Sequence, residues 1–183
     1  MNYYIDIEVL PDLEIGAQHL LNNVFAKCHR VISQHGEGNV GVSFPQYKKM
    51  LGHVLRLHGS DTDLHRLMAL NWLAGLKDYC HCSAVVNVPT NARYRTVSRY
   101  QRKSAHNKRK RSIAKGWLTQ EQATEAIPDT QQQDITYPFI ALKSLSNHNP
   151  MRIYIKLGKL QNEPHNGTFG SYGLSATTTI PWF

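Results

Sequence analysis

The sequence has no run of about 18 apolar residues, so no segment could cross a bilayer as a helix. Its three cysteines, Cys28, Cys80 and Cys82, are too few and odd in number for a disulfide framework. The chain also opens on a polar, strand-like segment where a secreted protein would carry a signal peptide. These absences favour a soluble protein of the reducing cytoplasm with no membrane partner.

Acidic residues are missing from one long segment. Between Tyr79 and Gln120 there is no Asp or Glu, while ten of the 21 Lys and Arg residues fall there. The rest of the chain has 11 basic and 13 acidic side chains, so this segment accounts for the net charge of +8. Because binding of phosphates releases condensed counterions, nucleic acid is the leading partner. A solvated basic loop is the alternative, and a membrane surface fits less well because the segment lacks an apolar helical face.

The pattern of possible metal ligands is weak. Cys80-His81-Cys82 has no second ligand pair downstream, and in a strand the two cysteines face one way and His81 the other. The carboxylates do not converge as a two-metal nuclease requires. We therefore expect no metal and no cofactor. We interpret these acids as sheet-edge, turn and cap residues: Asp6, Glu8, Asp12, Glu14, Asp61 and Asp63.

Hydrophobic spacing in the first half predicts alternating strands and helices. Residues 3–9 alternate as a strand, and apolar residues recur at helical spacing from 15 to 35, where Gly36 supplies a stop. Strands at 40–44 and 53–58 follow, then a helix capped by Ser60 and running to Leu73, then a strand at 79–88. The order β-α-β-β-α-β is that of the ferredoxin-like plait, a scaffold that hosts many activities.

The second half predicts a smaller α/β domain. Residues 89–92 are interpreted as a linker, and 104–115 as a basic helix. Thr119 and Gln122 form a capping box for a helix to about Ala126. Strands and turns are expected at 138–144, 151–157 and 167–175. The fold class is therefore α+β.

His29 is the first candidate catalytic residue. It lies in the second half of the long helix, where Phe25 and Ile32 place it at the border of the apolar stripe. By spacing alone, an ordinary half-buried histidine is the commoner interpretation. An imidazole near a helix C-terminus can nevertheless transfer a proton at neutral pH. RNA cleavage by the 2′-hydroxyl needs a base, an acid and positive charge near the phosphorane, and no metal.

The basic segment has two parts. Residues 93–102 interleave arginines with tyrosines and an amide, which suits stacking on bases and contacts to guanine or adenine edges. Further on, Lys108, Arg111 and Lys115 share one helical face, with Arg109 and Lys110 alongside to reach phosphates. Because the major groove of a long A-form duplex is too narrow for side chains, a short hairpin is the better partner.

Seven segments in order resemble the subtype I-F CRISPR-associated endoribonuclease family, which cuts the repeat hairpins of a precursor transcript into CRISPR RNAs. The resemblance covers essentially the whole chain. The segments are YYIDIEVLPD at 3–12, AKCHR at 26–30, GVSFP at 41–45, YRTVSRYQRKS at 94–104, IPDT at 127–130, LKSLS at 142–146, and SYGLS at 171–175 with the terminal PWF.

The resemblance implies a ferredoxin-like catalytic domain at 1–89 and an RNA-hairpin-binding domain at 90–183 that carries the basic helix into the major groove. It makes His29 the catalytic histidine, Ser144 the serine that holds the ribose and its 2′-hydroxyl, and Tyr172 the tyrosine that orients the histidine. Without it, Ser144 and Tyr172 would be an ordinary strand-end hydroxyl and a packing residue. The products would carry a 2′,3′-cyclic phosphate and a 5′-hydroxyl.

The resemblance also implies RNA contacts. Arg99 and Gln101 match the pair that reads bases at the foot of the stem, and Met151 stands where the family has a base-stacking phenylalanine. A thioether stacks less well than a ring, and lysines on the basic helix keep charge but lose the bidentate fork of arginine. The other expected RNA contacts are Arg102, Lys103, Lys108, Arg109, Lys110, Arg111 and Lys115.

The implied partners are the CRISPR repeat hairpin, in precursor and mature crRNA, and other subunits of a crRNA-guided surveillance complex. Two alternatives are open. One is a non-catalytic RNA-hairpin-binding subunit of a ribonucleoprotein, and the other is a DNA-binding or ribosome-associated ferredoxin-like module.

Overall fold

The structure is a computed structural model that describes residues 1–101, 104–128, 135–143 and 149–183. It contains helices and antiparallel sheets, in agreement with the predicted α+β class. The chain forms two compact units. The main unit joins Met1–Tyr100 to Tyr137–Phe183, and the helical unit is Gln101–Thr136. These units are defined by packing, and the functional division at residue 89 stays a prediction.

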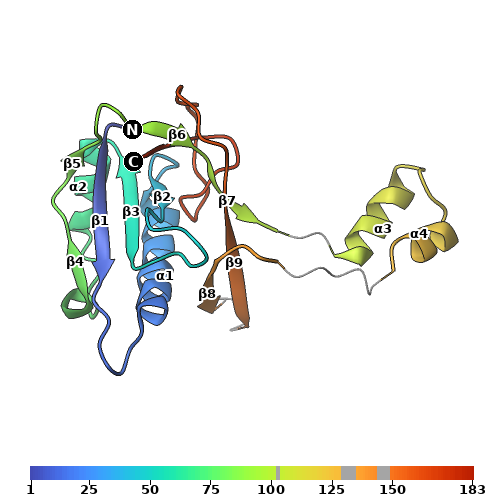
Figure 1. Cartoon of the computed structure of the whole chain (residues 1–183), viewed down its shortest axis with the longest axis horizontal. Coiled ribbons are helices and arrows are strands. Elements are labelled where there is room, and N and C mark those ends of the chain that lie inside the picture. Colours follow the sequence, from blue (N-terminus) through green and yellow to red (C-terminus); the bar gives the residue numbers. More distant parts are fainter. Residues whose placement is uncertain (102–103, 129–134, 144–148) are drawn as a thin grey trace. The chain divides into compact units, whose positions relative to one another are not determined.

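An antiparallel sheet runs through the first half of the main unit (Figure 1). Its strand order is β2-β3-β1-β4, with β5 also paired to β1. The central strand β1 pairs with β3 in the register Ile5 opposite Leu57. Every second side chain of β1 is buried from Ile5 onward, as the alternation predicts. The strands are β1 (Tyr3–Val9), β2 (Gly41–Ser43), β3 (Val54–Gly59), β4 (Cys80–Cys82) and β5 (Val86–Asn87).

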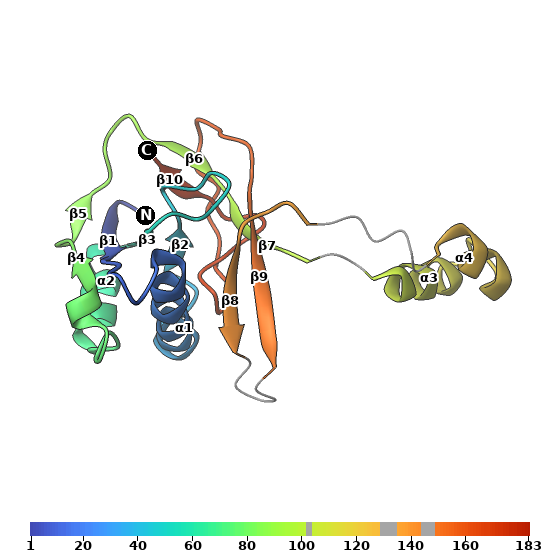
Figure 2. The ribbon, with the colours of Figure 1, turned by 60° about the horizontal axis from the view of Figure 1, so that its bottom comes forward.

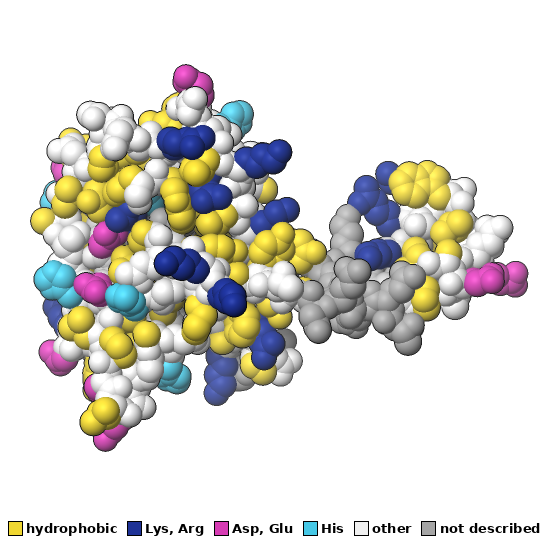
Figure 3. Space-filling view, viewed as in Figure 1, with side chains coloured by type: hydrophobic (Ala, Val, Ile, Leu, Met, Phe, Trp, Pro, Cys, Tyr) yellow, Lys and Arg dark blue, Asp and Glu magenta, His cyan; other side chains and the backbone are white. Residues whose placement is uncertain are grey.

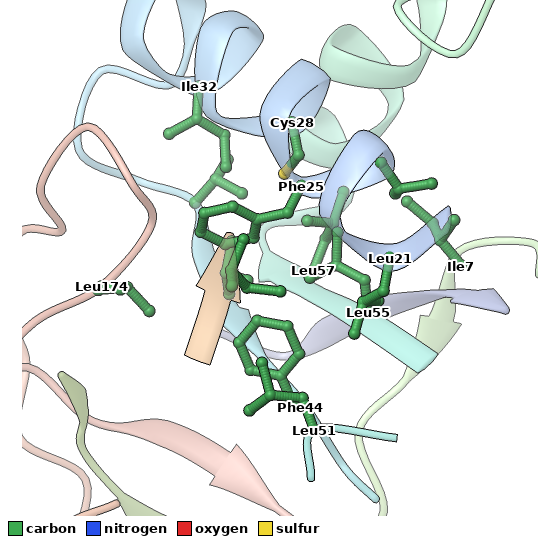
Figure 4. Packing of buried hydrophobic residues seen from close by; sticks show 14 of the residues in the cluster. Ile7, Leu21, Phe25, Cys28, Ile32, Phe44, Leu51, Leu55, Leu57 and Leu174 are labelled. Atoms are coloured by element: carbon green, nitrogen blue, oxygen red, sulfur yellow. The ribbon is translucent and has the colours of Figure 1, made fainter. Parts of the chain in front are cut away.

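Two helices accompany this sheet: α1 (Ala17–His35) and α2 (Asp61–Ala69). The predicted helical spacing of α1 is confirmed, because its buried positions recur every three to four residues. Figure 4 shows Phe25 and Cys28 of α1 pointing into a core that also contains Phe44 and Leu57. No helix among the described residues is long and apolar enough to cross a bilayer.

Three predicted boundaries in the first half are wrong. The Ser60 cap is present, since its Oγ accepts a hydrogen bond from Asp63 N, but α2 ends at Ala69 and not at Leu73. Asn71, with φ of 50°, adopts a left-handed conformation that breaks the helix. The predicted strand at 79–88 is two short strands, β4 and β5, separated at residues 83–85, and η1 (Lys77–Tyr79) covers its start.

A second antiparallel sheet, with the order β7-β9-β8, shares the core of the first half. Strands β7 (Val97–Tyr100) and β6 (Arg93–Arg95) were not predicted, nor was β10 (Ile180–Trp182), which pairs with β6. Strands β8 (Phe139–Lys143) and β9 (Pro150–Leu157) were predicted. Ile140, Ile153 and Ile155 of these strands belong to the same buried cluster as the α1 side chains, so the end of the chain packs on its beginning.

The helical unit contains α3 (Ala105–Ala114) and α4 (Gln120–Ala126). Both were predicted within one residue. Thr119 and Gln122 form the predicted capping box, in which each side chain accepts a hydrogen bond from the other residue's backbone N–H. Arg109 Nη1 donates to Ile127 O at 2.7 Å and thereby ties α3 to the end of α4.

Candidate active site

His29 is half-buried on α1, with its ring fixed on one side by the backbone of the glycine-rich C-terminal segment. Its Nδ1 lies 2.8 Å from Ser171 O. Because a carbonyl oxygen can only accept, Nδ1 carries the proton of this hydrogen bond. The other nitrogen, Nε2, then has a lone pair in the neutral ring. This is the tautomer that a general base requires.

Tyr172 fixes the plane of the His29 imidazole. Its ring stacks on His29 with the centroids 4.0 Å apart and the planes 14° apart. Phe25, one turn before His29 on α1, lies nearly parallel to the same tyrosine at 6.3 Å. The hydrogen bond fixes one edge of the imidazole and the stacking fixes its plane, so the ring has a defined orientation. The structure thus brings together two of the three residues that were assigned to catalysis.

A tight turn presents both Ser171 and Tyr172. Gly170 N donates to Leu174 O, and Gly173 N donates back to Gly170 O at 2.8 Å. Gly173 has a φ of +67°, and an added Cβ would lie 2.4 Å from Val42 Cγ2, so this position requires glycine. Sequence reasoning did not identify the Ser171 carbonyl, because a backbone acceptor has no side-chain signature.

Arg99 brings positive charge to the same tyrosine. The side chain comes from β7, and its Cζ lies 5.6 Å from the Tyr172 ring centroid. Its Nε is buried and has no hydrogen-bond partner among the described residues. A buried donor without a partner is costly, and a phosphate or base edge would satisfy it. The His29 imidazole and the Arg99 guanidinium therefore both lie close to the Tyr172 ring.

Strand β8 runs alongside α1, toward the C-terminal half of that helix (Figure 2). Gln18 Nε2 donates to Phe139 O at 3.3 Å, and Ala141 N donates to Asn22 Oδ1 at 3.0 Å. Both segments thus advance in the same direction. From residue 22 to 29 the helix rises by about 10 Å, and from residue 141 to 143 the strand rises by about 7 Å. The end of β8 therefore approaches the level of His29.

The remaining site residues fall into three groups. Met151 is partly buried against the core cluster, opposite Leu142. Gln101 is exposed, and so are four of the five predicted cations on α3 or at its C-cap. The fifth, Arg109, is partly buried. Three predicted site residues lie outside the described residues: Ser144, Arg102 and Lys103. The exposed cations are Lys108, Lys110, Arg111 and Lys115.

Two of the acids accept hydrogen bonds within the main unit. Asp6 receives two hydrogen bonds from Arg56, and Asp12 Oδ1 accepts from the backbone of Glu14 and Ile15. Cys80 and Cys82 are half-buried while His81 is exposed, as the strand alternation predicts. Burial raises the pKa of the Cys80 thiol to about 11. In the described parts of the chain, no group of three His, Cys, Asp or Glu residues could hold a metal ion.

Comparison with known proteins places the chain in a class, that of CRISPR-associated proteins. Residues 4–183 match the family model described as CRISPR-associated protein (Cas_Csy4). The chain belongs to the Cas_Csy4 family, and the resemblance noted in the sequence is confirmed.

Two relatives share the name CRISPR-associated endonuclease Cas6/Csy4. The protein from Escherichia coli (strain UTI89 / UPEC) is 48% identical over 184 residues, and the alignment covers all of both chains. The protein from Pseudomonas aeruginosa (strain UCBPP-PA14) is 37% identical over 187 residues, again over all of both chains.

Proposed function

We propose that the chain is a metal-independent endoribonuclease that cleaves the hairpins of CRISPR repeat RNA to give mature crRNAs. The observation that carries the proposal is the orientation of His29, whose Nδ1 is bonded to Ser171 O and whose ring is stacked on Tyr172. The names of the two relatives support the substrate class and the endonuclease activity.

In the proposed reaction, His29 Nε2 takes the proton of the 2′-hydroxyl upstream of the cut. The 2′-oxygen then forms a bond to phosphorus, and the bond between phosphorus and the 5′-oxygen breaks. The departing 5′-oxygen takes up a proton from water. This leaves a 2′,3′-cyclic phosphate on one product and a 5′-hydroxyl on the other. Arg99, which lies 5.6 Å from the Tyr172 ring centroid, is proposed to read bases at the foot of the stem next to the cut, where its charge would also stabilise the additional negative charge of the phosphorane.

Ser144 is proposed to hold the ribose and its 2′-hydroxyl. Support comes from the course of β8, which is hydrogen-bonded to α1 through Asn22 and ends at Lys143 near the level of His29. The residue that follows is Ser144. A serine hydroxyl both donates and accepts, so it suits a ribose hydroxyl.

Residues 1–89 are proposed to form a ferredoxin-like catalytic domain. The sheet order β2-β3-β1-β4, its antiparallel pairing and the element order β-α-β-β-α-β support this. Residues 90–183 are proposed to bind the hairpin. Exposed cations on α3 would contact phosphates. Arg109 is a proposed RNA contact too, and its hydrogen bond to Ile127 O also stabilises the helical unit. Gln101, Arg102, Lys103 and Met151 stay proposed contacts near the foot of the stem.

We further propose that the protein stays on its product within a crRNA-guided complex in the cytoplasm. The family name associates the chain with CRISPR systems. An enzyme with a separate basic binding surface can retain the RNA after the bond is cut, since the phosphate contacts are unaffected by cleavage.

The proposal is tested with a labelled repeat hairpin and His29→Ala, with and without EDTA. We expect wild-type cleavage to persist in EDTA, and the variant to bind normally but cut at least about 100-fold more slowly, the usual contribution of a general base. His19→Ala is the matched control, because His19 is an exposed histidine on the same helix. Loss of cleavage in EDTA would contradict the metal-independent mechanism. A tight but uncut hairpin with wild-type protein would support a non-catalytic RNA-binding subunit.

A further inference from the structure

The sheet β7-β9-β8 has one face in the core and one face open. On β9, Ile153 and Ile155 are buried, and Met151 and Leu157 pack against the core cluster. The alternate residues of the three strands point the other way. We call their surface the open face; it consists of Ser98, Tyr100, Phe139, Ala141, Lys143, Arg152, Tyr154 and Lys156.

A row of aromatic rings crosses the open face. Tyr154 on the central strand is paired with Tyr100 on one side and with Phe139 on the other. Phe139 and Tyr154 lie 5.5 Å apart, and Tyr100 lies 4.9 Å from Tyr137, which extends the row. All four rings are partly exposed, and none packs against the core cluster. These rings are therefore not explained by the packing of the main unit.

The charged side chains of the open face all have one sign. Lys143, Arg152 and Lys156 are exposed, and the three strands contain no Asp or Glu. Arg152 lies over the Phe139 ring at 4.6 Å, and by alternation Arg152 and Lys156 flank Tyr154. In Figure 3, most visible Lys and Arg side chains of the main unit lie on the side of β7 to β9, and most acids lie on the side of β1.

The open face also adjoins both connections to the helical unit. Tyr100 is followed directly by Gln101, and Tyr137 follows Thr136. The chain therefore passes directly from residues of the aromatic row into the segments that lead to the helical unit. Arg99 and Tyr100 are neighbours on β7 whose side chains point to opposite faces, so a single strand that passes β7 can reach from the candidate active site to the open face.

We propose that the open face binds a single-stranded RNA segment that adjoins the hairpin. This inference rests on the proposed function, because the hairpin positions the segment. Exposed rings stack on bases of any sequence, and the three cations lie where a phosphate backbone would be neutralised. A double-stranded stem has no free base faces along its length, so the aromatic row favours a single strand.

The test measures the affinity of the full chain for three RNAs that carry 2′-deoxyribose upstream of the cut to block cleavage. The first is the minimal hairpin, the second has about ten single-stranded nucleotides added at the 5′ end, and the third has about ten added at the 3′ end. We expect the extension at one end to tighten wild-type binding by about tenfold, the effect of stacking one or two bases. Tyr154→Ala and the double variant Arg152→Gln, Lys156→Gln should each lose most of that gain and bind the minimal hairpin normally.

Lys77→Gln is the control for loss of charge, because Lys77 is exposed and lies in η1, beside β4. It should keep the whole gain. The glutamine variants leave every ring in place, so a folding defect of Tyr154→Ala does not decide the outcome. The inference is wrong if wild type binds extended and minimal hairpins equally, or if Tyr154→Ala and the double glutamine variant both keep the gain. The open face would then be a surface for a protein partner. Cleavage of the unmodified minimal hairpin reports on the proposed function separately.

Discussion

The stacking of Tyr172 on His29 gives a quantitative prediction about catalysis. Tyr172→Phe keeps the ring at 4.0 Å from the imidazole, whereas Tyr172→Ala removes it and leaves the hydrogen bond to Ser171 O as the remaining constraint. An aromatic pair of this geometry contributes about 0.5–1.5 kcal/mol beyond burial. Since about 1.4 kcal/mol corresponds to tenfold in rate, the alanine variant should cut between about twofold and tenfold more slowly.

The assay is single-turnover cleavage of a labelled repeat hairpin at saturating protein, with the dissociation constant measured separately. Tyr172→Phe should cut within about twofold of the wild-type rate, and both variants should bind the hairpin normally, because stacking acts on the orientation of the imidazole. Thermal unfolding shows whether the alanine variant is folded. Equal defects in the two variants would show that the hydroxyl, and not the ring, is the functional group, and the argument from stacking would be refuted.

Three further predictions concern stability. Gly173→Ala places a side chain at φ +67° and against Val42, so it should lower the free energy of unfolding in urea by about 2 kcal/mol; an unchanged midpoint would contradict the steric argument. Asp6→Ala leaves Arg56, whose side chain is 10% exposed, without its carboxylate and should cost about 2 kcal/mol, while adding Arg56→Met should recover part of that loss. Burial lowers the pKa of His58 from 6.5 to about 3. The unfolded state therefore binds the proton more readily, so stability is full above about pH 6.5 and falls by up to about 1.4 kcal/mol per pH unit as the pH drops toward 3. His58→Gln should flatten this slope, and an unchanged slope would exclude His58 as its source.

Elements with a strong periodic pattern could be predicted from the sequence. The spacing of apolar residues gave α1 and placed His29 at the edge of its buried stripe, where the structure has it half-buried. The same reasoning predicted that Cys80 and Cys82 share a face, because the side-chain period of a strand is two. Local capping chemistry predicted the start of α4 at Thr119.

Features that depend on tertiary contacts could not be predicted. Apolar residues continue past Ala69, so periodicity extended α2 through Asn71, where the backbone turns left-handed. The strands β6 and β7 lie in a segment whose arginines and tyrosines were interpreted only as RNA contacts. Arg95 there donates to Gly158 O at 2.7 Å and lies over the Trp182 ring. Composition does not distinguish an arginine that packs from one that binds RNA.

The partners of His29 were predictable only in part. The family resemblance supplied Tyr172, and the structure brings it onto the imidazole from 143 residues further along the chain. Spacing along one helix contains no information about a contact at that separation. The open face of β7, β8 and β9 was also missed, because its rings come from three strands and the residue Tyr137 before β8, and the register of the strands is set by pairing.

Attack by the RNA's own 2′-hydroxyl is tested most directly with a repeat hairpin that carries a single 2′-deoxyribose immediately upstream of the cut. Wild-type protein should bind this RNA as tightly as the all-ribose hairpin and should leave it uncut, because the proton that His29 is proposed to remove is missing together with the nucleophile. Cleavage of the deoxy substrate at the same bond would contradict this mechanism and would require a different nucleophile, such as water.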